Sequence, residues 1–195
     1  HITTAGHWNA LARVLIHATS PGVPDTYQGD ELWFFALVDP DNRRPVDYER
    51  RDQLLSAVTG AGALRGLHPS DERVKVGMVQ RLLNIRRDHA AFFTRGRYTP
   101  LEVRGTHAEH VVAFARSVDD AQAIVVAPRV IQGLLVDNGR LPNWADTELV
   151  LPQTLQRNSY RLVLEDRELA IPRVSSALAL SQVLTELPLT LLLSS

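Results

Sequence analysis

Apolar residues recur at helical spacing in the first half of the chain. Residues 5–19 carry them three and four positions apart, on one face of a predicted helix, at Leu11, Val14, Leu15 and Ala18. Asp47 is a good N-cap, so a second helix is predicted from there to about Val58. A third is predicted from Ser70, as its N-cap, to about His89. Its apolar stripe must pack on another element, and it consists of Val74, Met78, Leu82 and Ile85.

Between the first two predicted helices, residues 23–28 form a short strand candidate bounded by Gly22 and Gly29. A long polar loop follows and ends near Pro45. The order of helix, strand and long loop is typical of a parallel α/β unit.

After Phe93 the apolar period changes from helical to two-residue alternation. Strands are expected in "LEVRG" from Leu101, "HVVAFARS" from His110, "AIVVAPR" from Ala123 and "ELVLP" from Glu148, separated by turn-rich pieces such as "VDDAQ" and "DNGRLPN". Several short strands at such spacing predict an antiparallel β-sandwich. The fold class is therefore α+β, with a helical domain at 1–95 and a β domain at 96–195.

Composition restricts the possible partners and surroundings of the protein. An apolar fraction of 45% supports a real core, and a formal net charge of -1 supplies no positive field for nucleic acid or an anionic membrane surface. The absence of cysteine fits a reducing compartment, so a cytoplasmic protein is expected. The only methionine is Met78, which leads us to expect a piece of a longer protein.

The densest polar chemistry lies in "DPDNRRP", where two prolines stiffen a loop of donors and acceptors. A carboxylate that accepts and a guanidinium that donates match neighbouring sugar hydroxyls, so Asp39 and Arg43 could clamp one glucose. An internal ion pair that only holds the loop in shape is equally consistent with the spacing. Glu31 is expected to bind loop amides rather than to take part in catalysis.

Two further groups invite a functional interpretation. One of the three consecutive aromatic residues 33–35 could offer an apolar platform to a sugar ring, with the others partly in the core. His107 and His110 flank Glu109 and suggest a metal site, but without a third ligand motif solvated turn residues are the better interpretation, and no metal is assigned.

The stretch "SPGVPDTYQGDELW" followed by "LVDPDNRRPVDYERR" resembles the α-amylase superfamily, and within it the maltooligosyl trehalose synthase family. The later "RLLNIRRDHAAFF", "HVVAFAR", "IVVAPR" and "WADTELVLP" extend the likeness over nearly the whole chain. Two positions depart from the family pattern: Phe34, where an acidic residue is frequent, and Ala90, where a proline is frequent.

The resemblance implies the C-terminal end of a (β/α)8 barrel, as a mostly helical remnant, followed by an antiparallel β-sandwich. It implies that the catalytic carboxylates lie on earlier strands, so no catalytic residue is assigned here, and Asp25, Asp30 and Glu31 are not given that role. The expected substrate-binding residues are Tyr27 and Gln28 at the cleft floor and Asp39, Arg43 and Arg44 near the cleavage point.

The activity implied for the parent protein converts the reducing-end α-1,4 linkage of a maltooligosaccharide into an α,α-1,1 linkage. No cofactor is expected, and the partners are the glucan and the upstream part of the barrel. The isolated piece is predicted to be inactive. The alternatives are another hydrolase or transglucosidase of the superfamily, and a non-catalytic glucan-binding module.

Overall fold

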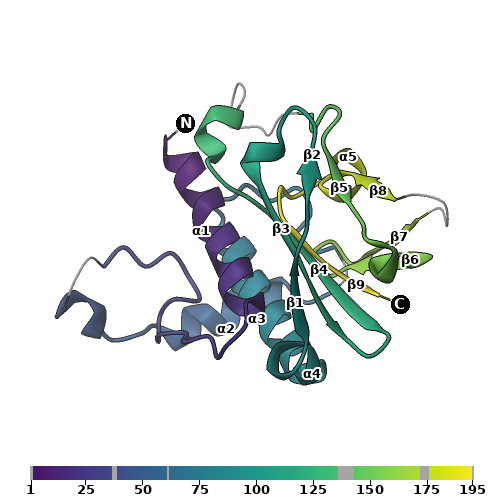
Figure 1. Cartoon of the computed structure of the whole chain (residues 1–195). Helices are drawn as coiled ribbons and strands as arrows, with labels where there is room; N and C mark the ends of the chain where they lie inside the picture. Colours follow the sequence, from purple (N-terminus) through teal and green to yellow (C-terminus); the bar gives the residue numbers. More distant parts are fainter. Residues whose placement is uncertain (1, 37–38, 61, 136–142, 172–175, 195) are drawn as a thin grey trace.

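Helices come first along the chain and strands second (Figure 1). The computed structural model describes residues 2–36, 39–60, 62–135, 143–171 and 176–194. The main helices are α1 (Ile2–Thr19), α2 (Tyr48–Ala57), α3 (Glu72–Asp88) and α4 (Ala90–Thr94), with a short 3-10 turn, η1, at Asp41–Arg43. Within the described residues, no helix combines the length and apolar character needed to cross a bilayer.

The three predicted helices are present, with different first residues in two cases. Helix α1 begins at Ile2 rather than at Ala5, and its predicted face is buried at Leu11, Leu15 and Ala18. Asp47 caps α2 as expected, because its carboxylate accepts a hydrogen bond from the Arg50 amide at 2.9 Å. The cap predicted for α3 at Ser70 is wrong. Asp71 accepts from the Arg73 amide instead, and the Ser70 hydroxyl lies 2.6 Å from His68 Nδ1.

The strand predicted at residues 23–28 does not form. Residues 23–27 have no regular secondary structure, Gln28 lies in a turn, and Val23 is 94% exposed. The segment pairs with no strand among the described residues. A strand needs a neighbouring strand to complete its backbone hydrogen bonds. All strand pairs among the described residues are antiparallel and lie in the two sheets described below, so residues 23–28 have no partner strand. Residues 23–28 therefore continue directly into the polar loop.

The strands form two antiparallel sheets, as the alternating pattern predicted. The larger sheet has the order β1-β3-β4-β9-β6-β7 and consists of Arg97–Pro100, Val111–Val118, Ala121–Pro128, Thr190–Ser194, Ser159–Leu162 and Arg167–Ala170. The smaller has the order β2-β5-β8 and consists of Val103–Arg104, Glu148–Val150 and Ala177–Ala179. In the described part of the chain, further short helices lie between strands: η2 (Ala108–His110), η3 (Ile131–Leu134), η5 (Gln153–Leu155) and α5 (Leu180–Val183).

The predicted strands match β2 to β5, with the turn "VDDAQ" joining β3 to β4 through Asp119 at φ 51°. Residues 136–142, which include most of the predicted turn "DNGRLPN", lie outside the described residues.

Helix α1 lies against β4 of the larger sheet and α4 against β3, while α3 packs on α1 (Figure 1). The buried side chains of helices and strands form one continuous core. Two arginines join the layers at the end of α1. Arg86 of α3 donates to the Ala18 carbonyl at 2.7 Å, and Arg116 of β3 donates to the Thr19 and Gly96 carbonyls at 3.2 and 2.9 Å. These contacts fix the end of α1, from which the chain continues toward the polar loop. The division into domains 1–95 and 96–195 stays a prediction.

Candidate functional site

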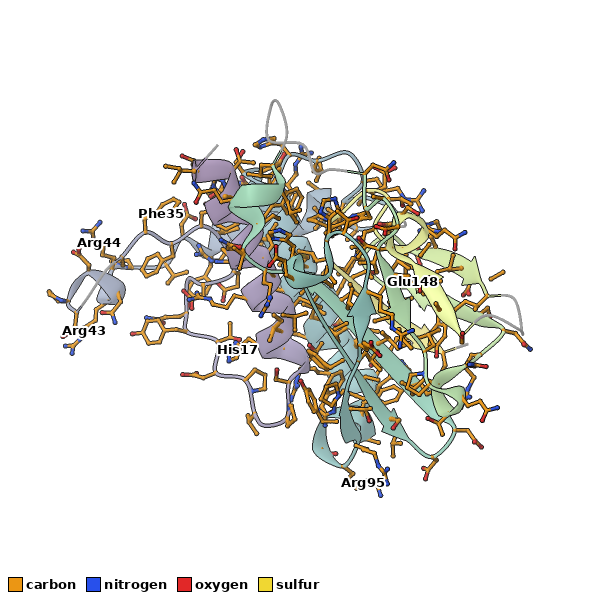
Figure 2. The ribbon with its side chains drawn as sticks, turned by 45° about the horizontal axis from the view of Figure 1, so that its top comes forward. His17, Phe35, Arg43, Arg44, Arg95 and Glu148 are labelled. Carbon is orange, nitrogen blue, oxygen red and sulfur yellow. The ribbon has the colours of Figure 1, made fainter. Side chains whose placement is uncertain are left out.

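The most polar segment of the chain projects from the body of the protein as a loop between α1 and α2. We define this polar loop as residues 29–47, of which the structure describes 29–36 and 39–47. Its tip carries η1, and the side chains of Phe35, Arg43 and Arg44 extend from it away from both sheets (Figure 2). Leu32 is its one buried apolar side chain among the residues that the structure describes.

The two charged pairs at the tip are open to solvent. Arg43 Nε lies 2.5 Å from Asp39 Oδ1, with the side chains 70% and 54% exposed, and Arg44 Nη2 lies 2.7 Å from Asp41 Oδ1. The ion pair that the sequence allowed is therefore present. An exposed pair of this kind contributes at most about 1 kcal/mol, so ligand hydroxyls can replace it at little cost. A glucose clamp at Asp39 and Arg43 stays a prediction.

Tyr27 and Gln28 precede the polar loop and are both exposed. They lie in a turn in which the Asp30 amide donates to the Tyr27 carbonyl at 3.1 Å. Within the described residues, no hydrogen bond or ion pair joins either side chain to Asp39, Arg43 or Arg44. The structure thus brings together the three residues of the tip and leaves Tyr27 and Gln28 as a separate group.

The base of the polar loop is held by a partly buried arginine that sequence reasoning missed. Arg51 of α2 donates to the Gly29 carbonyl at 2.9 Å, to the Asp47 carbonyl at 2.8 Å and to Glu31 Oε2 at 3.0 Å. Glu31 Oε2 also accepts from the Gly29 amide at 3.1 Å, which confirms the structural role expected for Glu31. The signal available in the sequence was the pair Arg50-Arg51 in the first turns of a predicted helix.

The aromatic residues 33–35 differ in how firmly they are held. Trp33 donates from Nε1 to the Ser70 carbonyl at 3.1 Å and packs edge-on against His7, with ring centroids 4.6 Å apart. Phe35 is 83% exposed. Phe35 is therefore the aromatic side chain of the three that a ligand could reach most easily.

A small cavity of about 70 Å³ lies between α1, α3 and the start of the polar loop. Its charged lining comes from Arg13, His17, Asp25, Asp30 and Lys75. Burial lowers the pKa of Lys75, and the nearby Asp30 opposes this shift. Lys75 Nζ donates to the Leu32 carbonyl at 2.7 Å, which ties the polar loop to α3. The unusual lysine in "RVKVGMV", within an apolar run, was the signal for it.

His107 and His110 do not form a metal centre with Glu109. Their rings are 6.3 Å apart, and His110 Nδ1 faces the Val130 carbonyl at 3.2 Å. In the part of the chain that the structure describes, no three histidine, cysteine, aspartate or glutamate side chains gather as metal ligands.

Comparisons with known proteins agree with the resemblance carried by the polar loop. A Mycobacterium tuberculosis protein named maltooligosyl trehalose synthase is 43% identical over 124 residues, which are 64% of this chain and 14% of the relative. The structure of maltooligosyltrehalose synthase from Arthrobacter ramosus superposes with a TM-score of 0.79 and 35% identity, covering 99% of this chain and 23% of the other. A further maltooligosyl trehalose synthase structure, at 23% identity and a TM-score of 0.69, shares the fold. No family model matches the chain.

The chain therefore spans between one seventh and one quarter of the length of these relatives. Over that length the resemblance to maltooligosyl trehalose synthases is confirmed, and so is a mixed fold of helices and antiparallel sheets.

Proposed function

We propose that this chain is the C-terminal portion of a maltooligosyl trehalose synthase, and that its polar loop binds the glucan substrate near the bond that is rearranged. The observation that carries the proposal is the exposed "DPDNRRP" tip, which combines two carboxylates and two guanidinium groups on a segment with almost no role in the core. Its setting within a fold that matches a solved synthase at 35% identity supports it.

In the proposed reaction an enzyme carboxylate attacks C1 of the penultimate glucose, and the bond from that carbon to O4 of the terminal glucose breaks. A carboxylic acid protonates O4 as it leaves. The result is a covalent glycosyl-enzyme, as in retaining glycosidases. The released glucose stays bound, and its O1 then attacks the same C1, which breaks the ester bond to the first carboxylate. The O1 proton passes to the second carboxyl group, which had given its own proton to O4. The atoms of substrate and product are the same, and one α-1,4 linkage has become an α,α-1,1 linkage.

We place these two catalytic carboxylates on the part of the parent protein that precedes this chain, so the isolated chain is expected to be inactive. The contribution of the chain is to hold the glucan while its terminal glucose turns. The Asp39 and Arg43 side chains can exchange their contact with each other for hydrogen bonds to two sugar hydroxyls. One hydroxyl donates to the Asp39 carboxylate, and the other accepts from the Arg43 guanidinium. Water must be excluded at this stage, because its attack on the glycosyl-enzyme would give hydrolysis instead of transfer.

The test compares Asp39→Ala and Arg43→Ala with Arg87→Ala in the complete synthase that carries this segment. Arg87 is a matched control, because it too is an exposed arginine in an ion pair, with Asp88 on α3. Both loop variants should raise the KM for maltohexaose at least severalfold, and the control should not. Unchanged KM and unchanged nonreducing product in both loop variants would refute the role of the loop.

A second measurement separates the synthase from a hydrolase of the same superfamily. The proposed isomerisation consumes reducing ends without releasing glucose, whereas hydrolysis creates one reducing end for each bond broken. Accumulation of reducing ends in step with turnover by the complete protein would favour the hydrolase. Calorimetric titration of the isolated chain with maltooligosaccharides would reveal a binding module that acts unaided.

A further inference from the structure

The two ends of the polar loop meet at one side chain. Arg51 projects from α2 and reaches the Gly29 carbonyl at the start of the loop and the Asp47 carbonyl at its end, through two different nitrogens. Its third nitrogen, Nε, donates to Glu31, whose carboxylate also accepts from the Gly29 amide. The Arg51 side chain is only 13% exposed, although α2 has no buried residue.

We propose that Arg51 is a positioning residue that closes the base of the polar loop and so determines where the Asp39 and Arg43 tip meets a glucan. This inference rests on the proposed function of the tip. We call Arg51, Glu31, Gly29 and Asp47 the Arg51 clasp.

Among the residues that the structure describes, few other contacts hold the tip in place. The ion pairs at the tip are exposed and local, joining residues three and four positions apart, so they shape η1 without attaching it to the body of the protein. Lys75 and Trp33 attach the first residues of the loop to α3 and its preceding turn. The return path from the tip to α2 is joined to that anchored start by the Arg51 clasp.

The clasp needs an arginine rather than a lysine. A guanidinium presents donors on three nitrogens in one rigid plane, and here each nitrogen has its own acceptor. A lysine ammonium keeps the charge but lacks the fork that spans the Gly29 and Asp47 carbonyls. Replacing Arg51 by lysine should therefore loosen the loop almost as much as removing the charge.

Limited trypsin digestion of this chain tests the clasp without any sugar. Trypsin can cut the exposed Arg43–Arg44 bond at the tip when the loop opens far enough to enter the protease. We expect cleavage there to be about tenfold faster in Arg51→Gln and nearly as fast in Arg51→Lys. Arg50→Gln is the matched control. It removes one arginine from the same turn of α2, but that side chain pairs with Glu72 and not with the loop.

The same three variants in the complete synthase test positioning. Arg51→Gln should raise the KM for maltohexaose severalfold with an unchanged melting temperature, while Arg50→Gln keeps the KM of the original enzyme. Hydrogen exchange of the peptides that cover residues 29–47 should speed up in Arg51→Gln and Arg51→Lys but not in Arg50→Gln.

Each outcome decides one question. Equal cleavage of Arg51→Gln and the original chain, or full protection by lysine, overturns the clasp. Faster cleavage with an unchanged KM, while Asp39→Ala raises KM, overturns the positioning role. If Asp39→Ala and Arg43→Ala also leave KM unchanged, the proposed function itself has failed, whereas the cleavage rates still decide the clasp on their own.

Discussion

The same substitution, glycine to alanine, should stabilise the protein at one helical position and fail to do so at another. Gly6 lies in α1 with nothing within 4 Å of an added Cβ. Gly77 lies in α3, where an added Cβ would come within 2.7 Å of Leu64 Cδ2 and 3.4 Å of Val58 Cγ2. Both neighbours are buried, so neither can move aside freely.

The expected magnitudes follow from two competing terms. Alanine is favoured over glycine inside a helix by up to about 1 kcal/mol, which should stabilise Gly6→Ala by about that amount. Overpacking a core position costs about 1 to 3 kcal/mol, which should cancel or exceed this gain in Gly77→Ala. Because both variants share the propensity term, the difference between their unfolding free energies isolates the packing cost.

Urea denaturation of the two variants and the original chain, followed by circular dichroism, measures that difference. We expect Gly77→Ala to be less stable than Gly6→Ala by about 1 to 3 kcal/mol, with unchanged m-values. Equal stabilisation of both variants would refute the close approach of α3 to the segment that follows α2. That approach matters for the site, because α2 carries Arg51.

Three further predictions test local features. Burial raises the pKa of Tyr160 to about 12, so the unfolded chain ionises first and stability should fall above pH 10 by about 1.4 kcal/mol per pH unit. Tyr160→Phe should remove this fall in urea titrations across pH, whereas Tyr48→Phe, at an exposed site, should keep it. Burial lowers the pKa of Lys75 below 10.5, so the folded chain loses that proton first and stability should rise with pH just below 10.5. Lys75→Met should abolish the rise, and a persisting rise would contradict the assignment. Asp47→Ala should cost about 1 kcal/mol and speed amide exchange in α2, whereas Asp47→Asn should retain the cap.

The sequence predicted the elements whose signals are local. Helical spacing located α1 and α3, and alternation located β3 and β4, since both patterns reflect which face is buried. The cap of α3 was misplaced by one residue because Ser70 and Asp71 are both good caps. The choice depends on a contact between the Ser70 hydroxyl and His68 Nδ1, which leaves Asp71 as the cap.

Elements that depend on distant partners were harder to predict. Residues 23–28 have strand-like composition, but a strand forms only where another strand completes its hydrogen bonds. Arg51 joins residues four and twenty-two positions away, and no spacing rule links an arginine to two backbone carbonyls. The loop tip, by contrast, could be predicted as charged and exposed, because its two prolines and four charged side chains disfavour a place in the core.

The separation between core and loop determines how loop variants can be interpreted. Leu32 is the one buried apolar side chain that residues 29–47 contribute among the described positions, and it lies next to the anchored start of the loop. Truncation at Asp39 or Arg43 removes only exposed atoms and an ion pair of small net value, so the free energy of unfolding should change by less than about 1 kcal/mol. A severalfold change in KM from either substitution would therefore report on glucan binding itself, because loss of folded protein lowers the apparent rate and leaves KM unchanged.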